Sequence, residues 1–405
     1  MVQFSAPAPS AAVRARPALA GLALAGLALA AALAGCAASR PAVPVDAGPV
    51  RAAEAAAQDT LIERLARRAV RRGDRTLDVL LLSGGGQHGA YGTGFLRAWN
   101  GLPGGRAMPR FDLVTGVSTG SLQAPFAVVG TDAALAEATA LYRDAAERIA
   151  PRLDPLFLFR RTGGVVDASR LQNTLRETFD AAFCRDLAAA FAEGRQLAVG
   201  TVDLGAGVGR TWALADELGD CAAPQERVHA LLLASASIPG IFPPVRIDGG
   251  LHSDGGVAEN LRPVLDLDGL RRLDAALARR GVAGPVTVRL WTVMNVWLDG
   301  QSQPLDGGSA RKVSQRANAL LFVLQQRPLV ESLQTVACAA EAALPRLRVE
   351  FRATAVPNEA AAMPGAAALF DGPYMARLDA LGAERAASAQ PWDVAVRGCT
   401  PLPGR

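Results

Sequence analysis

The chain has 405 residues, of which half are hydrophobic, a fifth are charged and only 5% are aromatic. This composition excludes a disordered or fibrous protein and allows a sizeable core built from Ala, Leu and Val. Basic and acidic residues nearly balance, at 42 against 38, and no basic tail or stripe occurs, which argues against nucleic-acid binding. Length alone would suggest two or three domains, although α/β folds often form one unit of this size.

The N-terminus has the layout of a secretory leader, with two arginines before an uncharged apolar run over 18–34. The sequence Leu33-Ala34-Gly35-Cys36 resembles the lipobox of bacterial lipoproteins, in which cleavage leaves the Cys as the lipidated first residue. We therefore expect a signal peptide over 1–35 and anchoring through Cys36 to a bacterial membrane, facing the periplasm, with the outer membrane favoured. An uncleaved anchor is the alternative, but the run is short for a span and Ala and Gly insert weakly.

Four cysteines remain after Cys36, and an even number in an exported chain permits two disulfides with three possible connectivities. Proximity along the chain favours Cys184–Cys221 and Cys338–Cys399, and unpaired buried thiols are the alternative. The spacing of these cysteines matches no metal-binding pattern, so we expect neither a metal nor a cofactor.

From Cys36 onward, residues 36–57 are rich in Ala and Pro, which predicts a tether. A helical pattern with one apolar face spans 52–72, and we place an N-terminal helix at 58–75 before a single domain over 76–390 and a C-terminal tail over 391–405. Strands are predicted at 77–82, 111–115, 197–204, 210–214, 286–296 and 347–353, and helices at 90–99, 119–129, 132–149, 168–179, 228–236, 317–336 and 373–386. Strands that alternate with helices predict a three-layer α/β/α fold with a mainly parallel central sheet.

A glycine-rich turn, Ser83-Gly84-Gly85-Gly86-Gln87-His88-Gly89, follows the first predicted strand. Such glycines adopt backbone conformations closed to other residues, and their N–H groups can converge on an anion at a helix N-terminus. The turn also satisfies the G-x-G-x-x-G pattern of dinucleotide sites. Those sites need an acidic residue at the end of the second strand, however, and Asp112 lies at its start.

The second predicted strand runs into Gly116-Val117-Ser118-Thr119-Gly120 and then into a helix. G-x-S-x-G between a strand and a helix is typical of a nucleophile elbow, where small neighbours leave room for a Ser on a sharp turn. The helix N-terminus favours the negative charge that develops there. Ser118 is therefore the candidate nucleophile.

A serine nucleophile needs a base, and a histidine is one option. A triad of Ser118 with Asp203 and either His229 or His252 is possible, although nothing in their local sequence favours it.

An aspartate is the other option. Two short extended runs around an Asp248-Gly249 turn end at Asp254, which Gly255 and Gly256 follow. These glycines would let the Asp254 carboxylate approach another backbone and remain uncovered.

These three patterns, in this order, resemble the patatin-like phospholipase family, and the resemblance extends over 76–390. The segment 234–244 before Asp254 and the late helix around 374–377 are also similar to the family. The resemblance implies a Ser–Asp dyad, in which Asp254 takes the proton of Ser118 and Ser118 attacks an acyl ester. It further implies an oxyanion hole at Gly84, Gly85, Gly86, Gln87 and Thr119, elbow glycines at Gly116 and Gly120, and an Asp-Gly motif with Gly255 and Gly256.

The implied activity is that of a membrane-anchored phospholipase or lysophospholipase that needs no metal. A non-catalytic lipid-binding envelope protein with the same fold and a lipid acyltransferase are the alternatives. One departure bears on this choice, because the family usually has Arg or Lys where His88 stands, and the charge of a His depends on pH. The head group, sn-position, chain length, protein partners and oligomeric state stay open.

Two further segments have simple interpretations. Leu156-Phe157-Leu158-Phe159 predicts either a lid or lipid-facing edge, or a segment of a core helix. Asp266-Leu267-Asp268-Gly269 is too short for a calcium loop and predicts a surface turn.

Overall fold

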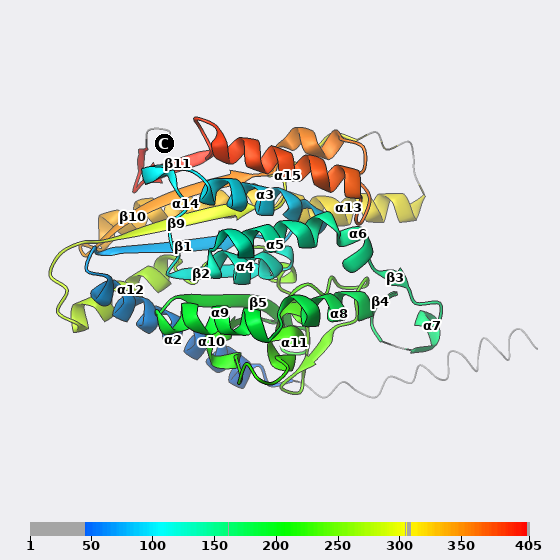
Figure 1. Cartoon of the computed structure of the whole chain (residues 1–405), viewed down its shortest axis with the longest axis horizontal. Coiled ribbons are helices and arrows are strands. Elements are labelled where there is room, and N and C mark those ends of the chain that lie inside the picture. The colour runs from blue at the N-terminus through cyan, green and yellow to red at the C-terminus, as the bar shows by residue number, and fades with distance from the viewer. Residues whose placement is uncertain (1–44, 161, 304, 306–308, 403–405) are drawn as a thin grey trace, which may run out of the picture. The chain divides into compact units, whose positions relative to one another are not determined.

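The structure is a computed structural model that describes residues 45–160, 162–303, 305 and 309–402 (Figure 1). The predicted leader, Cys36 and the part of the predicted tether before residue 45 lie outside the described residues. The body described below begins at Asp46. Within the described residues, no helix combines the length and apolar character needed to cross a bilayer.

One mixed sheet forms the centre of the described body, with the strand order β12-β11-β10-β9-β1-β2-β5-β8-β7 and β6 beside β5. The strands are β1 Thr76–Leu82, β2 Leu113–Val117, β5 Gln196–Asp203, β6 Val208–Ala213, β7 Val245–Ile247, β8 Gly250–Asp254, β9 Val286–Met294, β10 Leu347–Ala355, β11 Val394–Arg397 and β12 Thr400–Pro401. Strands β10, β9, β1, β2 and β5 run parallel, and the outer pairs are antiparallel. The predicted mainly parallel central sheet is confirmed. A separate pair joins β3 Arg152–Leu153 to β4 Val166–Asp167.

Helices cover both faces of this sheet, which gives the predicted three layers (Figure 1). One face packs against α2 Gly48–Arg72, α12 Leu267–Arg279 and α14 Gln326–Ala343. The other packs against α3 Gly89–Asn100, α4 Thr119–Val129, α5 Asp132–Arg143, α8 Ser169–Thr178, α9 Ala181–Ala192, α11 Glu226–Ser235 and α15 Gly372–Ala387. The remaining helices are α6 Ala145–Arg148, α7 Phe157–Arg160, α10 Leu214–Glu217 and α13 Ala310–Val323.

Strand β1 illustrates why the sequence forms a covered sheet. Leu77, Val79 and Leu81 pack on the α2 side, whereas Leu80 and Leu82 pack on the α3 side. Alternate side chains of a strand point to opposite faces, so a continuous apolar run fits a strand that is buried on both.

Several predicted elements have different boundaries in the structure. The helix expected at 132–149 divides into α5 and α6, and the helix expected at 317–336 divides into α13 and α14. The predicted surface turn at Asp266 is wrong, because the Asp266 side chain accepts a hydrogen bond from the Gly269 amide at 2.7 Å and caps α12.

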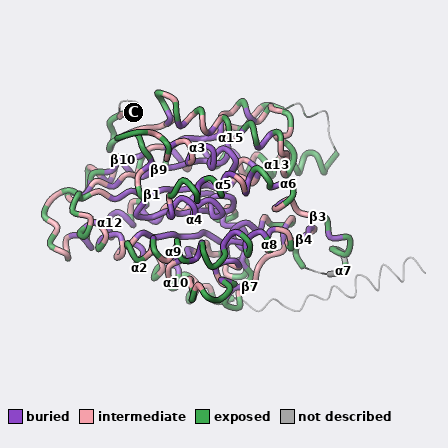
Figure 2. Tube along the Cα trace, viewed as in Figure 1, coloured by how far each residue is buried: buried purple, intermediate pink, exposed green. Residues whose placement is uncertain are grey.

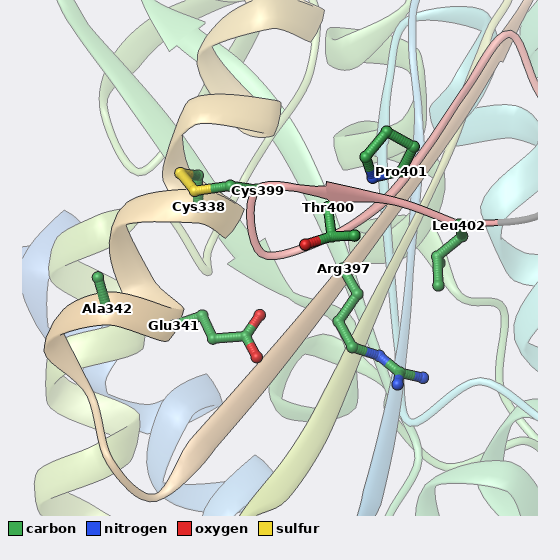
Figure 3. A pocket seen from close by; sticks show the side chains of 8 residues that line it. All are labelled: Cys338, Glu341, Ala342, Arg397, Cys399, Thr400, Pro401 and Leu402. Atoms are coloured by element: carbon green, nitrogen blue, oxygen red, sulfur yellow. A yellow bond between two sulfur atoms is a disulfide. The ribbon is translucent and has the colours of Figure 1, made fainter.

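The two chain ends also differ from expectation. Helix α2 begins at Gly48, inside the segment expected to be a tether. Strand β11 pairs with β10 and β12 pairs with β11, so the expected tail joins the sheet as far as Pro401. A disulfide links Cys338 on α14 to Cys399 in this hairpin, beside a cavity of about 450 Å³ (Figure 3).

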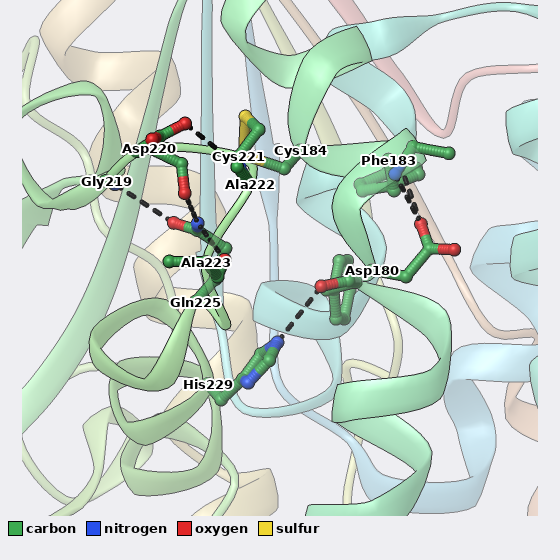
Figure 4. Close-up of a disulfide and its surroundings, with 12 residues drawn as sticks. Asp180, Phe183, Cys184, Gly219, Asp220, Cys221, Ala222, Ala223, Gln225 and His229 are labelled. Carbon is green, nitrogen blue, oxygen red and sulfur yellow. Dashed lines mark hydrogen bonds between the residues drawn. A yellow bond between two sulfur atoms is a disulfide. The ribbon is translucent and has the colours of Figure 1, made fainter.

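A second disulfide joins Cys184 on α9 to Cys221 in the loop before α11 (Figure 4). Both pairs are those that proximity along the chain favours. Gln225 fixes the same loop, since its side chain accepts from the Gly219 amide at 2.9 Å and donates to the Asp220 carbonyl at 2.8 Å.

The register of the parallel strands brings the three sequence motifs to one edge. Leu82 lies beside Gly116 across β1 and β2, and Leu82 also lies beside Val293 across β1 and β9. The glycine-rich turn after β1 and the elbow after β2 therefore meet at the carboxyl ends of the strands, where α/β folds form their sites.

Candidate active site

Ser118 occupies a sharp turn between β2 and α4, with φ 53° and ψ −125°. A non-glycine residue at positive φ is strained, and such strain concentrates at functional sites. The flanking glycines make the turn possible, because a Cβ on Gly116 would lie 2.4 Å from the Gly120 carbonyl oxygen. A Cβ on Gly120 would lie 2.3 Å from the Leu82 carbonyl oxygen. The predicted elbow therefore has the geometry that its sequence requires.

Hydrogen bonds hold the elbow in this conformation. The Ser118 amide donates to Oγ of Ser235 at 3.0 Å, and that hydroxyl donates to the Gly200 carbonyl at 2.6 Å. The Ser118 carbonyl accepts from both the amide and the hydroxyl of Ser121, at 2.9 and 2.6 Å. The surrounding helices and β5 thus fix the position of the nucleophile.

Asp254 ends β8 and lines the same cavity as Ser118, whose side chain interacts with its carboxyl group. Its Oδ1 also accepts from the Gly256 amide at 2.8 Å. A Cβ on Gly255 would lie 2.5 Å from the Gly200 carbonyl oxygen, so this glycine allows the close approach of β8 to β5. Burial raises the pKa of Asp254 to about 6, although the hydrogen bonds from Ser118 and Gly256 act in the opposite direction.

The glycine-rich turn passes directly beside the nucleophile. A Cβ on Gly84 would lie 2.9 Å from Cβ and 3.6 Å from Oγ of Ser118. The Gly84 amide already donates to the Asn260 carbonyl at 3.4 Å. No described residue accepts from the amides of Gly85 and Gly86, which leaves these two as the donors of this turn for an oxyanion.

His88 supports this turn through the Gly85 carbonyl, which accepts from its Nδ1 at 2.7 Å and from its backbone amide at 3.2 Å. A carbonyl only accepts, so Nδ1 carries the proton. Burial lowers the pKa of His88 to about 4, and the ring packs edge-on against Trp297 and Tyr374. The imidazole is therefore neutral near pH 7. Its support of the turn should not change with pH in the neutral range, unlike that of a His with an ordinary pKa.

Two residues predicted for the oxyanion hole have other roles in the structure. The Gln87 side chain donates to the carbonyls of Gly365 and Ala368, at 3.1 and 2.8 Å, and accepts from the Asp371 amide at 2.9 Å. The Gln87 side chain thus holds the loop before α15, which lines the cavity at Ser118, and is not itself among the residues that line the cavity. The Thr119 hydroxyl pairs with that of Tyr142, so only the Thr119 backbone amide, at the start of α4, could face an oxyanion.

The histidines considered as bases are engaged elsewhere. His252 Nδ1 pairs with the Thr201 hydroxyl at 3.1 Å, and its Nε2 lies 3.8 Å from Asp203. His229 Nε2 pairs with the Phe179 carbonyl at 3.1 Å (Figure 4). Neither ring lines the cavity at Ser118, whereas Asp254 does, so Asp254 stays the candidate base.

The dinucleotide alternative also fails in the structure. Asp112 is fully buried at the start of β2 and forms ion pairs with Arg68 at 2.8 Å and Arg72 at 2.7 Å. These contacts attach α2 to the sheet, at the end of the strands opposite to the glycine-rich turn. Asp112 therefore has a structural role.

Ser118 and Asp254 lie in a cavity of about 750 Å³. Its lining is mostly apolar and comes from the glycine-rich turn, the segments after α11 and β8, the loop after β9, α13 and the loop before α15. The main apolar wall residues are Ile238, Val257, Val296, Trp297, Ala319, Leu320, Phe322 and Val323. The size and lining suit a ligand with a hydrocarbon chain. The described residues contain no cluster of three or more His, Cys, Asp or Glu side chains that could hold a metal.

Two asparagines that the sequence did not single out hold the glycine-rich turn. Asn295, after β9, donates from Nδ2 to the Ser83 carbonyl at 2.8 Å and to Gln123 at 3.0 Å. Asn260 donates from Nδ2 to Gln326 at 2.7 Å, and its backbone carbonyl accepts from Gly84. Both positions lie far along the chain from the turn, and no local motif marks them.

Residues 80–268 match the sequence model of the family described as "Patatin-like phospholipase". The chain carries a patatin-like phospholipase domain. The matched residues include the turn at Gly84, Ser118 and Asp254, and the predicted family is confirmed. The presence of this domain supports lipid acyl hydrolase activity.

The chain is similar to VipD from Legionella pneumophila at 13% identity and a TM-score of 0.31, over 76% of this chain and 67% of that one. No curated protein matches the chain.

Proposed function

We propose that the protein is a membrane-anchored serine acyl hydrolase of phospholipid or lysophospholipid esters that uses a Ser118–Asp254 dyad. The observation that carries this proposal is the meeting of the strained Ser118 and the buried Asp254 in one mostly apolar cavity, beside a glycine-rich turn. The patatin-like phospholipase domain supports the same class of reaction.

In the proposed mechanism, Asp254 takes the proton of Ser118 while Oγ bonds to the ester carbonyl carbon. The amides of Gly85 and Gly86 stabilise the tetrahedral oxyanion, and one lost donor of such a hole costs about 3–4 kcal/mol. When the tetrahedral intermediate collapses, the C–O bond to the alcohol breaks and Asp254 returns its proton to the leaving oxygen. Asp254 then deprotonates a water that attacks the acyl-Ser118 ester, and the fatty acid leaves as Ser118 regains the proton.

Exposed apolar side chains support work at a lipid surface. In the segment around α7, Leu153 and Phe159 are 74% and 82% exposed, which excludes the core-helix alternative for this segment. On α13, Leu321 and Leu324 are 64% and 56% exposed, although the same helix lines the cavity. In the view of Figure 2 both segments lie toward the same end of the molecule. Exposed large apolar side chains beside a lipid-sized cavity are consistent with contact with a membrane surface.

The proposal also includes attachment of the protein to a membrane through Cys36. Cys36 follows a leader-like sequence, and lipidation with more than one acyl chain gives stable membrane attachment. The two disulfides are typical of proteins exported to an oxidising compartment, which is consistent with a periplasm-facing location.

Labelling with a fluorophosphonate probe and hydrolysis of a lipid panel test this function. We expect the protein to be labelled and to release fatty acid, and Ser118→Ala to lose both, because the probe and the ester need the same hydroxyl. Ser169→Ala, at an exposed serine on α8, is the matched control and should keep both. Labelling that persists in Ser118→Ala would overturn the assignment, and inertness of the unsubstituted protein would favour a non-catalytic lipid-binding role. Adding an alcohol or lysolipid acceptor separates an acyltransferase from a hydrolase.

A further inference from the structure

The cavity at Ser118 is divided into an apolar part and a polar part. Ser118 and Asp254 are buried, and the side chains around them are mainly apolar. The polar part consists of residues 300–303 and Arg316, in which Ser302 and Gln303 are exposed. The polar part therefore lies at the solvent side of the cavity, and the dyad lies inside.

Arg316 is the cation of this polar part. Among the described residues that line the cavity, only Arg316 and Asp254 have side chains that are charged near neutral pH, since His88 is neutral. Arg316 is half-buried, and its guanidinium donates to the Gln301 carbonyl, which fixes it against the 300–303 segment. A guanidinium has five N–H donors, so one bond to a carbonyl leaves most of them free for a ligand.

No carboxylate among the described residues forms an ion pair with Arg316. Asp299, two residues before Gln301, is held by Arg327 at 2.6 Å and by Asn358 at 2.7 Å. Helix α13 itself contains no acidic residue. A half-buried cation that no described carboxylate pairs, at the mouth of a mostly apolar cavity, is suited to binding an anion.

We propose that Arg316 binds the phosphate of the substrate head group at the mouth of the cavity and makes the enzyme prefer phospholipid-type esters over uncharged acylglycerols. This inference rests on the proposed function, because it concerns the substrate of the same site. The acyl chain lies along the wall formed by Leu320, Phe322 and Val323, one to two turns further along α13. One helix thus contacts both parts of an amphipathic lipid, with Arg316 toward solvent and the apolar residues toward Ser118.

Binding to the Ser118→Ala background tests this proposal without turnover. Calorimetric titration compares a short-chain lysophosphatidylcholine, below its micelle concentration, with the monoacylglycerol that carries the same acyl chain. We expect Arg316→Gln to raise the Kd for the lysophospholipid about tenfold, as expected for one lost charge-assisted hydrogen bond, and to leave the Kd for the monoacylglycerol within about twofold. Arg316→Lys keeps the charge and should retain most of the preference. Arg311→Gln removes an exposed arginine of the same helix and should change neither Kd.

If Arg316→Gln raised the Kd for both lipids equally, the proposal would be overturned, because Arg316 would then only support the structure of α13. An unchanged Kd for the lysophospholipid would also overturn it. In the protein with Ser118 intact, Arg316→Gln should raise KM for the lysophospholipid and leave kcat within about twofold. If the unsubstituted protein hydrolyses neither lipid but the difference in Kd remains, the proposed hydrolase function fails and the role of Arg316 stands.

Discussion

At the residue scale, Asp254 performs its proposed role at a cost to folding stability. Burial raises its pKa from an ordinary 3.8 to about 6, so burying the ionised carboxylate on folding lowers the stability of the native state. A shift of this size corresponds to about 3 kcal/mol. The native state binds the proton more tightly than the unfolded state. The cost is therefore absent below about pH 4, grows between pH 4 and 6, and is complete above pH 6.

Replacing Asp254 by Asn should therefore separate activity from stability. We expect Asp254→Asn to lose turnover by at least about a thousandfold, because the amide cannot accept the Ser118 proton. The variant should also melt at a higher temperature than the unsubstituted protein at pH 8, and this difference should disappear near pH 4. Calorimetric scans at both pH values and an esterase assay measure these effects.

The exposed Asp186→Asn is the control and should change neither property. For the unsubstituted protein, kcat/KM should fall about tenfold per pH unit below pH 6, as Asp254 becomes protonated. Equal melting temperatures of Asp254→Asn and the unsubstituted protein at pH 8 would contradict the assigned burial cost.

At the element scale, the elbow depends on how closely α4 approaches β1. A Cβ on Gly120 would lie 2.3 Å from the carbonyl oxygen and 2.6 Å from the carbonyl carbon of Leu82. Both obstructing atoms belong to the backbone of a central strand, so they cannot move aside as a flexible side chain could. The position of Ser118 relative to the glycine-rich turn therefore depends on the absence of a side chain at Gly120.

Gly120→Ala should push α4 away from β1. We expect the free energy of unfolding to fall by about 1–3 kcal/mol or more, as in other overpacked cores, and probe labelling of Ser118 to be lost. Urea denaturation and labelling measure the two effects. Gly105→Ala is the matched control, because a Cβ there meets no atom within 4 Å and the residue is not at positive φ. Unchanged stability of Gly120→Ala would mean that α4 is not constrained as the structure indicates.

The sequence predicts those parts of the site that are local in the chain. The elbow, the glycine-rich turn and the Asp254 motif each need particular residues at fixed spacing, so each can be recognised from a short segment. The polar part of the cavity cannot be recognised in this way. Arg316 and Gln301 come together only because α13 returns over the cavity, and neither residue stands in a motif. Ion pairs such as Arg72–Asp112 likewise join residues from separate elements.

The boundaries predicted within single elements fail for a similar reason. Periodicity continues through the break between α13 and α14, since both helices have apolar residues at helical spacing. Only the contacts of the folded chain separate them, because α14 packs against β10 and α13 lines the cavity.

At the scale of the whole molecule, the body is joined covalently at two places. The Cys184–Cys221 disulfide closes a loop on the α11 side of the sheet, and Cys338–Cys399 attaches the terminal hairpin to α14. Disulfides that close loops of these lengths typically contribute about 2–4 kcal/mol. The proposed lipidation of Cys36 would attach this body to a membrane.

Cys36→Ser tests this arrangement in cells of a bacterial host. We expect the variant to lose palmitate incorporation and to move from washed membranes to the soluble fraction, because the acyl chains supply the stable attachment. Its hydrolysis of a soluble short-chain ester should persist, since Ser118 and Asp254 lie in the body that begins at Asp46. Ser118→Ala is the reciprocal control and should keep the lipid and the membrane location while losing hydrolysis. If Cys36→Ser still incorporates palmitate, Cys36 is not the anchor. If the variant loses both palmitate and hydrolysis of the soluble ester, the proposed site and the anchor are not independent.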